Sequence, residues 1–355
     1  MSNTSKQTEF YNQPSEWQKH DSCWLAWPAR RDLWEENLEL AQTEFVDLCK
    51  SILNFDSKTQ TYRGEKLNIL VLNSKSLAQA EAIFKNMPVT LHIVTYGDIW
   101  LRDSAPIFIE DLKNKKLVNI KFGFNGWGEK YNLEGDKELG QQIAKLSDCE
   151  SIDKLSFILE GGSIEADGQG TFLTTDQCLM NPNRNPHMSK IQIEEELKIL
   201  GAKKVIWIKE GLLNDHTDGH IDTIARYVAP GEVVCMKAFD PETDPNSQVL
   251  YDIETTLKNA TDALGRKLKV HTIPSPGLIL NDDGEVMPAS YVNFYISNTS
   301  VLVPIYGSKF DDLAVESLQK IFPDRKVIGL SAKAILSGGG AFHCITQQVP
   351  LITNI

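Results

Sequence analysis

Apolar residues recur along this chain with two different periods, and the two periods alternate. Apolar positions three or four residues apart predict amphipathic helices at residues 36–53, 76–86, 135–146, 189–200, 252–264 and 311–322. Short runs rich in valine, leucine and isoleucine predict strands at residues 67–72, 91–96, 105–110, 117–122, 204–208, 268–273 and 326–330. Pairs of strands joined by a turn are predicted at residues 156–175, 223–236 and 290–306.

This alternation of strand pairs, helices and single strands predicts an α/β protein. The first two strand pairs are expected to turn at Asp167-Gly168 and Pro230-Gly231. A length of 355 residues suits one large domain or about two domains. Because neither a linker nor a change of composition divides the chain, we expect a single α/β domain over residues 1–355.

Charge and composition narrow the classes of partner. Lysine and arginine number 36 against 48 aspartate and glutamate residues, for a net charge of −12. Nucleic acid and anionic membranes are therefore not expected as partners, whereas a small cationic ligand would be attracted. The N-terminal segment lacks the basic and apolar regions of an export signal, and six cysteines lie far apart without a C-x-x-C pair. We expect a cytoplasmic protein with reduced thiols.

One of these cysteines stands in an unusual setting near the end of the chain. The stretch GGGAFHCITQQVP, residues 338–350, brings three glycines to a His343-Cys344 pair. Glycines allow a backbone to approach another group closely, and a cysteine that only packs in the core needs no such approach. Cys344 is therefore a candidate nucleophile or metal ligand as well as a packing residue. For His343, packing or a supporting hydrogen bond is the favoured interpretation.

Three other stretches carry polar residues at the ends of predicted strands. In HTDGHIDT, residues 216–223, His220 and Asp222 are predicted to begin a strand and to point to the same face. DIWLRDSAP contains Trp100 and Asp103, and LEGGS places Glu160 after an apolar run. Each alone also fits a solvated strand end or a core residue. Their separation of roughly 60 residues would fit a repeated module, although no sequence self-similarity accompanies it.

Two mechanisms compete for these residues. In the first, His216, His220, Asp222 and Cys344 ligate zinc. Thr-Asp-Gly between the two histidines is poor helix sequence, and no glutamate lies between them as in H-E-x-x-H hydrolases, so this alternative is disfavoured.

In the second mechanism Cys344 attacks an electrophilic carbon as a thiolate, and His220 transfers protons. Carboxylates near a thiol raise its pKa and repel oxyanions, so acyl transfer fits poorly. A guanidinium fits better, because two carboxylates can hold its paired N–H donors and its charge favours the thiolate. The Trp100 ring would cover its planar face.

Seven motifs resemble those of the agmatine deiminase and bacterial-type peptidylarginine deiminase family: WLAWP, DIWLRDSAP, LEGGSI, TTDQCLMNPNRNPHMSK, DGHID, SYVNFYI and GGGAFHCITQQVP. They occur in this order over nearly the whole chain. The resemblance implies a five-bladed, pseudo-symmetric α/β propeller (a pentein) built of ββαβ-type modules. It also implies hydrolysis of a guanidino group to a ureido group and ammonia through a covalent cysteine thiouronium, with neither a metal nor an organic cofactor.

The resemblance assigns a role to each matched residue. Cys344 is similar to the family nucleophile and His220 to its general acid and base, while Glu160 would orient His220 and bind a guanidine nitrogen. The two residues that match the guanidinium clamp and the one that matches the stacking wall are Asp103, Asp222 and Trp100. The nucleophile, the general acid and base, the orienting glutamate and the two clamp aspartates are all present. Their presence disfavours a catalytically inactive binding protein. The resemblance leaves homodimer formation open.

The sequence departs from the family where the far end of the substrate would bind. Enzymes of this family that act on agmatine carry an acid at the position of His216, and many carry asparagine at the position of Asp218. Both residues are candidates for substrate binding. Agmatine, which would yield N-carbamoylputrescine, is the first expectation. Arginine, peptidyl-arginine and another guanidino compound are the alternatives. Residues 183–185, Asn-Arg-Asn, are interpreted as loop-shaping.

Overall fold

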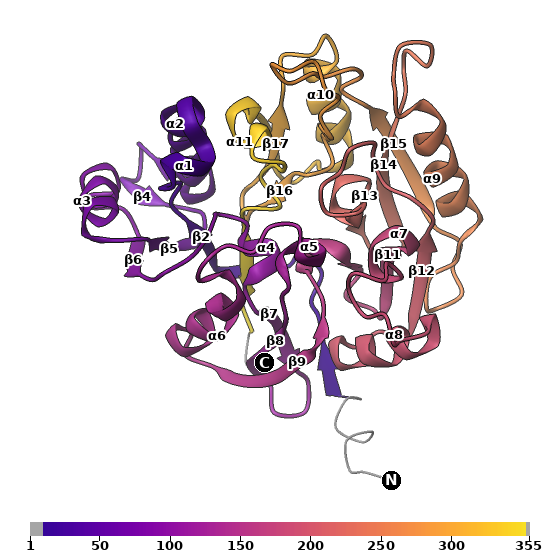
Figure 1. Cartoon of the computed structure of the whole chain (residues 1–355), viewed down its shortest axis with the longest axis horizontal. Helices are drawn as coiled ribbons and strands as arrows, with labels where there is room; N and C mark the ends of the chain where they lie inside the picture. The colour runs from indigo at the N-terminus through magenta and orange to yellow at the C-terminus, as the bar shows by residue number, and fades with distance from the viewer. Residues whose placement is uncertain (1–9, 353–355) are drawn as a thin grey trace.

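Residues 10–352 are described by the structure, a computed structural model. The first nine residues of the N-terminal segment discussed above, and the last three of the expected domain, lie outside this range. The strands form five sheets of three or four strands and one small sheet of two strands within the described residues. The six long helices lie around the outside of the molecule, whereas the short helices α4 (Leu101–Ser104) and α5 (Gly126–Glu129) lie near its middle (Figure 1).

Four sheets share one topology. In each of them an antiparallel strand pair is followed by a helix and then by a strand parallel to the second strand of the pair. The strands are β7 (Ile107–Asp111), β8 (Lys116–Gly123), β9 (Glu150–Ile158); β10 (Glu165–Ala166), β11 (Thr171–Thr175), β12 (Lys204–Ile208); β13 (Ala225–Ala229), β14 (Glu232–Lys237), β15 (Lys269–Pro274); β16 (Tyr295–Ile296), β17 (Ser300–Ile305), β18 (Lys326–Ser331). The intervening helices are α6 (Asp136–Leu146), α8 (Lys190–Leu197), α9 (Ser247–Asn259) and α10 (Asp311–Ile321). A parallel pair requires such a crossover, which explains the helix in each unit.

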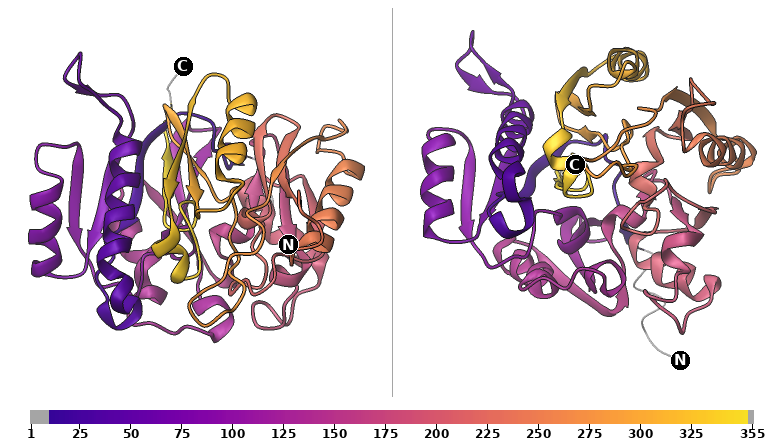
Figure 2. Two further views of the ribbon diagram at one scale, coloured as in Figure 1. Left: turned by 90° about the horizontal axis from the view of Figure 1, so that it is seen from above. Right: turned by 45° about the horizontal axis from the view of Figure 1, so that its top comes forward.

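The two ends of the chain complete the remaining unit together. Its sheet has the order β19-β2-β5-β6, and the C-terminal strand β19 (Gln347–Pro350) runs antiparallel to β2 (His20–Ala26). The parallel strands are β5 (Lys66–Val71) and β6 (Val89–Ile93), reached through α2 (Leu38–Leu53) and α3 (Ser74–Ile83). In Figure 2 the yellow C-terminal segment lies beside the indigo first part of the chain, in agreement with the pairing of β19 with β2. The N-terminal β1 (Tyr11–Asn12) joins the edge of the next sheet by pairing with β7.

Short elements complete the fold. The strands β3 (Phe55–Asp56) and β4 (Thr61–Tyr62) form a small hairpin. The short helices are α1 (Arg31–Trp34), α4 (Leu101–Ser104), α5 (Gly126–Glu129), α7 (Asp176–Leu179) and α11 (Lys333–Ser337). The 3-10 turns are η2 (Glu35–Asn37), η3 (Gly161–Ser163), η4 (Lys198–Leu200) and η5 (Ile221–Thr223). Within residues 10–352, none of the helices combines the length and apolar character needed to cross a membrane.

The long helices form because their apolar residues recur on one face and become buried. In α2, for example, Phe45, Leu48 and Ile52 are fully buried, three and four residues apart. α8 begins at a capping box in which Ser189 and Gln192 satisfy each other's backbone groups. All six predicted helices are confirmed in kind, as are the seven single strands. The helix predicted at 252–264 is shifted, because the chain is already extended at Ala260.

Two predicted strand pairs differ from the structure. The segment 156–175 does turn after Asp167, but its first half ends β9 in one sheet and then forms η3, so only β10 pairs with β11. In 290–306 only residues 295–296 pair with β17. The strands β2 and β19 were not predicted, since β2 is buried on both faces and lacks the alternation of a half-exposed strand.

Candidate active site

All the polar residues of interest lie in connections between sheets. Five such connections follow β6, β9, β12, β15 and β18, and they carry Asp103, Glu160, His220 with Asp222, Asn293 and Cys344 respectively. Since each unit is of similar length, the same connection recurs at roughly 60-residue intervals, which accounts for the spacing seen in the sequence. The fold thus gathers residues that are far apart along the chain.

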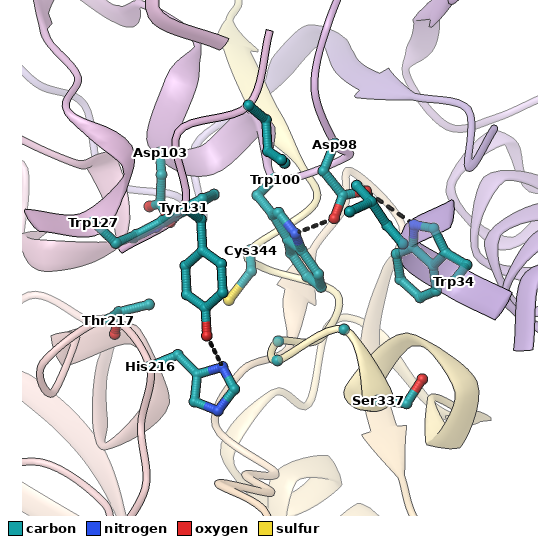
Figure 3. A pocket seen from close by; sticks show the side chains of 15 residues that line it. Trp34, Asp98, Trp100, Asp103, Trp127, Tyr131, His216, Thr217, Ser337 and Cys344 are labelled. Carbon is teal, nitrogen blue, oxygen red and sulfur yellow. Dashed lines mark hydrogen bonds between the residues drawn. The ribbon is translucent and has the colours of Figure 1, made fainter. Parts of the chain in front are cut away.

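A cavity of about 230 Å³ opens beside Cys344. Figure 3 shows the cysteine sulfur pointing into it, next to the Trp100 ring. Its lining consists of Leu33, Trp34, Asp98, Trp100, Asp103, Trp127, Tyr131, Leu133, His216, Thr217, residues 337–340 and Cys344. Aromatic rings and two aspartates therefore dominate the walls.

Three polar side chains meet around Gly162. A Cβ atom at this glycine would lie 2.6 Å from His220 Nδ1, 2.8 Å from Asp103 Oδ1 and 3.1 Å from Asp222 Oδ2. The Gly162 N–H donates to Asp103 Oδ1 at 3.0 Å, and His220 Nδ1 lies 3.7 Å from that oxygen. The glycine is required because any side chain would displace this group. His220 and Asp222 do come together, but the predicted strand is wrong. His220 precedes the 3-10 turn η5, because Asp218 and Gly219 adopt positive φ angles.

Cys344 is buried, with 6% of its surface exposed, and its sulfur has polar neighbours. Asn293 Nδ2 donates to Sγ at 3.1 Å, and Asp222 Oδ2 lies 3.5 Å away. Burial, together with the charges of Asp222 and Asp103, raises the pKa of Cys344 well above its ordinary value. The site by itself therefore holds the neutral thiol, and a cation placed among the carboxylates would favour the thiolate.

The opening of the cavity is shaped by the glycines before Cys344. A Cβ at Gly340 would lie 2.7 Å from Trp100 Cζ3 and 3.2 Å from Cys344 Sγ, and one at Gly338 would lie 2.8 Å from both Trp100 and Trp34. This part of the chain runs along the edge of the Trp100 ring. The glycines predicted to permit a close approach thus bring the cysteine against the indole.

Several buried polar atoms in the site have no partner within the protein. Among the described residues these include Glu160 Oε2, Asp222 Oδ1 and both ring nitrogens of His220. Buried polar groups are normally hydrogen-bonded, so the unpartnered carboxylate oxygens of Glu160 and Asp222 indicate a binding place for a ligand with N–H donors, whereas the His220 nitrogens are donors when the ring is protonated. The other oxygens of the two acids are occupied. Arg184 Nε donates to Glu160 Oε1 at 2.7 Å, and His343 Nδ1 lies 2.7 Å from Asp222 Oδ2.

His343 connects Asp222 to a buried ionic network. Its Nε2 lies 2.8 Å from Glu16 Oε1, and Glu16 also contacts Arg102 at 3.2 Å and Arg226. Burial opposes the ionised form of Glu16, but the positive charges of Arg226, His343 and Arg102 outweigh it and hold the pKa of Glu16 well below its usual range. The network orients Asp222 from behind, so that its free oxygen faces the site.

The carboxyl and imidazole groups of the site are electrostatically coupled. Burial, together with the charges of Asp222 and Glu160, raises the pKa of Asp103 to about 6, against the attraction of His220. Burial alone would lower the pKa of His220, but the negative charge of Asp103 and the neighbouring Cys178 and Glu160 raise it well above its ordinary value. His220 is therefore held as imidazolium between acids.

These shifts predict how the stability of the protein varies with pH. The pKa values of Asp98 and Asp103 are raised to about 6, and that of Asp136 to about 7, chiefly by burial. An aspartate in the unfolded chain titrates near about 3.9. Between these values the folded protein binds more protons, so stability is lost as the pH rises. We expect the melting temperature to rise by several degrees from pH 7.5 to pH 5, measured by circular dichroism. A fall over this range would contradict the shifts.

The predicted zinc ligands do not assemble. Among the described residues, the sets of three ligand atoms lying within 4.8 Å of one another are Glu160, Cys178 and His220, and Glu16, Glu165 and His343. His216 belongs to neither set, and the chain between it and His220 passes through positive φ angles at Asp218 and Gly219. The Arg184 guanidinium bound to Glu160 also disfavours a metal cation at the first set. The zinc alternative with His216, His220 and Asp222 is therefore wrong.

His216 and Asp218 occupy different places. His216 lines the cavity, where its ring stacks on Tyr131 at 6.0 Å and Nδ1 lies 3.2 Å from the Tyr131 hydroxyl. Asp218 is not among the described residues that line the cavity. Its carboxylate accepts hydrogen bonds from Lys130 at 2.6 Å and from Arg184 Nη1 at 2.8 Å.

Sequence reasoning missed several residues of the site. They are Glu16, Asp98, Trp127 and Asn293, and Arg184 was assigned only to loop shape. Trp127 donates from Nε1 to Asp103 Oδ2 at 2.8 Å. Its backbone in the stretch NGWG has a positive φ of 54°, a conformation that the sequence pattern does not predict. Asn293 lies in SYVNF, a stretch noted only as a motif. Glu16 lies shortly before WLAWP but outside every motif.

The fold resembles that of solved deiminases. The solved agmatine deiminase of Enterococcus faecalis is 31% identical, with a TM-score of 0.89, and the match covers 98% of each chain. A solved cysteine-to-serine variant of the C. jejuni agmatine deiminase, described as having substrate bound, is 29% identical with a TM-score of 0.84, and the match covers 97% of each chain. The fold is therefore the α/β fold of the agmatine deiminases.

The sequence comparisons define the family. A Mycoplasma capricolum protein named "Putative agmatine deiminase" is 38% identical over 375 residues, covering 99% of this chain and 98% of that protein. The model of the Porphyromonas-type peptidyl-arginine deiminases matches residues 12–350. This chain belongs to the Porphyromonas-type peptidyl-arginine deiminase family.

Proposed function

We propose that this protein is a cysteine hydrolase that deiminates a guanidino substrate, with agmatine as the first candidate. One observation carries the proposal. Buried carboxylate oxygens of Glu160 and Asp222 that lack a partner lie in one small space beside the His220 ring, and Asp222 also lies 3.5 Å from the Cys344 sulfur. A guanidinium supplies the planar set of N–H donors and the positive charge that such a space requires. Family membership supports the same activity.

Some residues of the site bind the guanidinium, and others take part in the reaction. Asp103 and Asp222 hold the guanidinium, Glu160 accepts from one of its nitrogens, and Trp100 covers the edge of the site. Arg184, itself held by Asp218, keeps Glu160 oriented. When the cation is bound, its charge lowers the pKa of Cys344, and the thiol releases its proton to solvent. Binding and activation of the nucleophile are then one event.

The reaction follows from the protonation states of the site. The Cys344 thiolate adds to the guanidinium carbon, and the imidazolium of His220 donates a proton to the nitrogen that leaves as ammonia. The resulting thiouronium is attacked by water, from which the now neutral His220 removes a proton. Cleavage of the C–S bond restores the thiolate, and the added hydroxyl group loses its proton to solvent as the ureido product is released. With agmatine the product is N-carbamoylputrescine.

The arrangement of the whole chain belongs to the same proposal. We propose that the five strand-and-helix units form one domain and close into a five-bladed propeller around the site. Pairing of β19 with β2, which joins the last segment to the first unit, supports closure. We further propose that the protein is cytoplasmic. Homodimer formation stays a hypothesis.

An ammonia-release assay tests the proposed function. Purified protein is incubated with agmatine, arginine and a blocked arginine peptide, and ammonia is measured enzymatically. We expect turnover with agmatine, loss of activity after alkylation with iodoacetamide, and no change with EDTA. Ureido product identified by mass spectrometry confirms the chemistry. Binding of agmatine without ammonia release would instead show an inactive guanidinium-binding protein, and activity lost to EDTA and restored by zinc would show a metallohydrolase.

A further inference from the structure

The cavity carries a second carboxylate that the proposed chemistry does not use. Among the described residues that line it, Asp98 and Asp103 are the acids, and neither lysine nor arginine is present (Figure 3). Asp103 belongs to the guanidinium clamp. Asp98 precedes the Trp100 segment and lies between two indole rings, where it is partly accessible. A cavity with two acids at separate places suits a ligand with two positive charges.

The Trp100 ring lies between the Asp98 carboxylate and the Cys344 sulfur. Asp98 Oδ2 accepts a hydrogen bond from Trp100 Nε1 at 2.8 Å, on the five-membered side of the indole. On the six-membered side, Cζ3 lies next to Gly340, where a Cβ atom would lie 3.2 Å from the Cys344 sulfur. Asp98 and Cys344 therefore lie at opposite ends of one indole. A ligand could therefore place its reacting carbon at the Cys344 sulfur and a second positive charge at the Asp98 carboxylate if the two groups are about one indole length apart.

Asp98 is held in place but keeps acceptor capacity. Its Oδ1 accepts from Trp34 Nε1 at 2.9 Å, so each carboxylate oxygen receives one indole N–H. Each oxygen of an ionised carboxylate can accept a further hydrogen bond. Burial raises the pKa of Asp98 to about 6, against the hydrogen bonds of the two indoles and the positive charge of Arg30, so the group is ionised at neutral pH. Two tryptophans thus orient a charged group along the cavity wall.

We propose that Asp98 binds the terminal ammonium group of the substrate and so selects guanidino compounds with a cationic tail. This inference rests on the proposed function. His216, which lines the same cavity, contributes no negative charge, so Asp98 supplies the anion for the tail. A tail that ends in a carboxylate would be repelled by the same group.

A series of three substrates with equal chain length tests this assignment in the unmodified protein. The probes are agmatine, butylguanidine and 4-guanidinobutyrate, whose tails end in an ammonium, a methyl and a carboxylate. We expect kcat/KM to fall about 10- to 100-fold from agmatine to butylguanidine, and further for the carboxylate. Equal kcat/KM for agmatine and butylguanidine would overturn the inference while leaving deimination established. Release of no ammonia from any of the three would count against both the proposed function and this inference.

The variant Asp98→Asn separates tail binding from support of the tryptophans. Asparagine keeps one acceptor and the size of the side chain but removes the charge. We expect the ratio of kcat/KM for agmatine to that for butylguanidine to fall by at least about tenfold, through KM. A loss equal for both substrates would show that Asp98 acts only by positioning Trp34 and Trp100, and would overturn the proposal. Glu134→Gln is the control for a lost negative charge, because this exposed acid is not among the described residues that line the cavity, although Leu133 beside it is, and the ratio should stay as in the original protein.

Discussion

Replacement of Cys344 by alanine is expected to reduce kcat with agmatine by at least about 10⁴-fold while substrate binding is retained. The reason is chemical: the sulfur is the group placed to form a bond to the guanidinium carbon, and no other cysteine is among the described residues that line the cavity. Loss of a nucleophile removes the covalent route entirely, and what remains comes from binding and polarisation. The measurement is single-turnover ammonia release, with dissociation constants from isothermal titration calorimetry.

A second cysteine gives the control for this variant. Cys149 lies directly before β9 against Asn119, away from the cavity, so Cys149→Ala should retain activity within about twofold. Binding in Cys344→Ala should stay within about tenfold, because the carboxylates that hold the cation are untouched. Turnover in Cys344→Ala above about 1% of the original rate would rule out covalent catalysis by this residue.

Replacement of Asp103 by asparagine is expected to lower kcat/KM by about 10³-fold. The side chain has two roles in the proposed mechanism. It holds the guanidinium by a charge-assisted hydrogen bond, and it stabilises the imidazolium of His220, whose Nδ1 lies 3.7 Å from Oδ1. Both KM and kcat should worsen, since the ground-state clamp and the proton donor are affected together. Steady-state kinetics with agmatine separate the two effects.

Stability distinguishes this loss from misfolding. The pKa of Asp103 is raised to about 6, mainly by burial, so at pH 7.5 the folded protein holds an ionised carboxylate at a cost in stability. Asparagine removes that cost, and we expect a melting temperature equal to or above that of the original protein, together with the loss of activity. Asp153→Asn, at an exposed acid of β9 paired with Lys121, should change neither the activity nor the melting temperature. A large fall in melting temperature for Asp103→Asn would show a structural role instead.

The agreement between sequence and structure is best for elements whose cause is local. The helices at 36–53 and 311–322 are present because one apolar stripe suffices to predict a helix that packs on a sheet. The strand 204–208 is confirmed residue for residue, since a short apolar run has few alternatives. Pairing is less local. The residues after β9 looked like a continuing strand, yet a glycine pair and the hydrogen bonds of Glu160 turn the chain into η3.

The same division holds for the site. Cys344, His220 and Asp103 were selected by the chemistry of their side chains and by the motifs that resemble the deiminase family, because each residue alone also fits a strand end or a core position. Glu16 gave no such signal. Its place behind Asp222 depends on contacts to Arg226 and His343, which lie 210 and 327 residues away. Contacts over such separations are decided by how whole sheets pack, and no local pattern records them.

The amino-acid sequence by itself determined the α/β class, the helices and the side chains proposed to handle a guanidinium, because helix periodicity and motifs are properties of neighbouring residues. Only the tertiary structure decided that His220, Asp103 and Asp222 meet around Gly162, that His216 does not join His220 in a set of possible metal ligands, and that Asp98 lies at the far end of the Trp100 ring. The physical reason is that distances between loops of different sheets follow from packing of the sheets, and packing is a property of the whole chain.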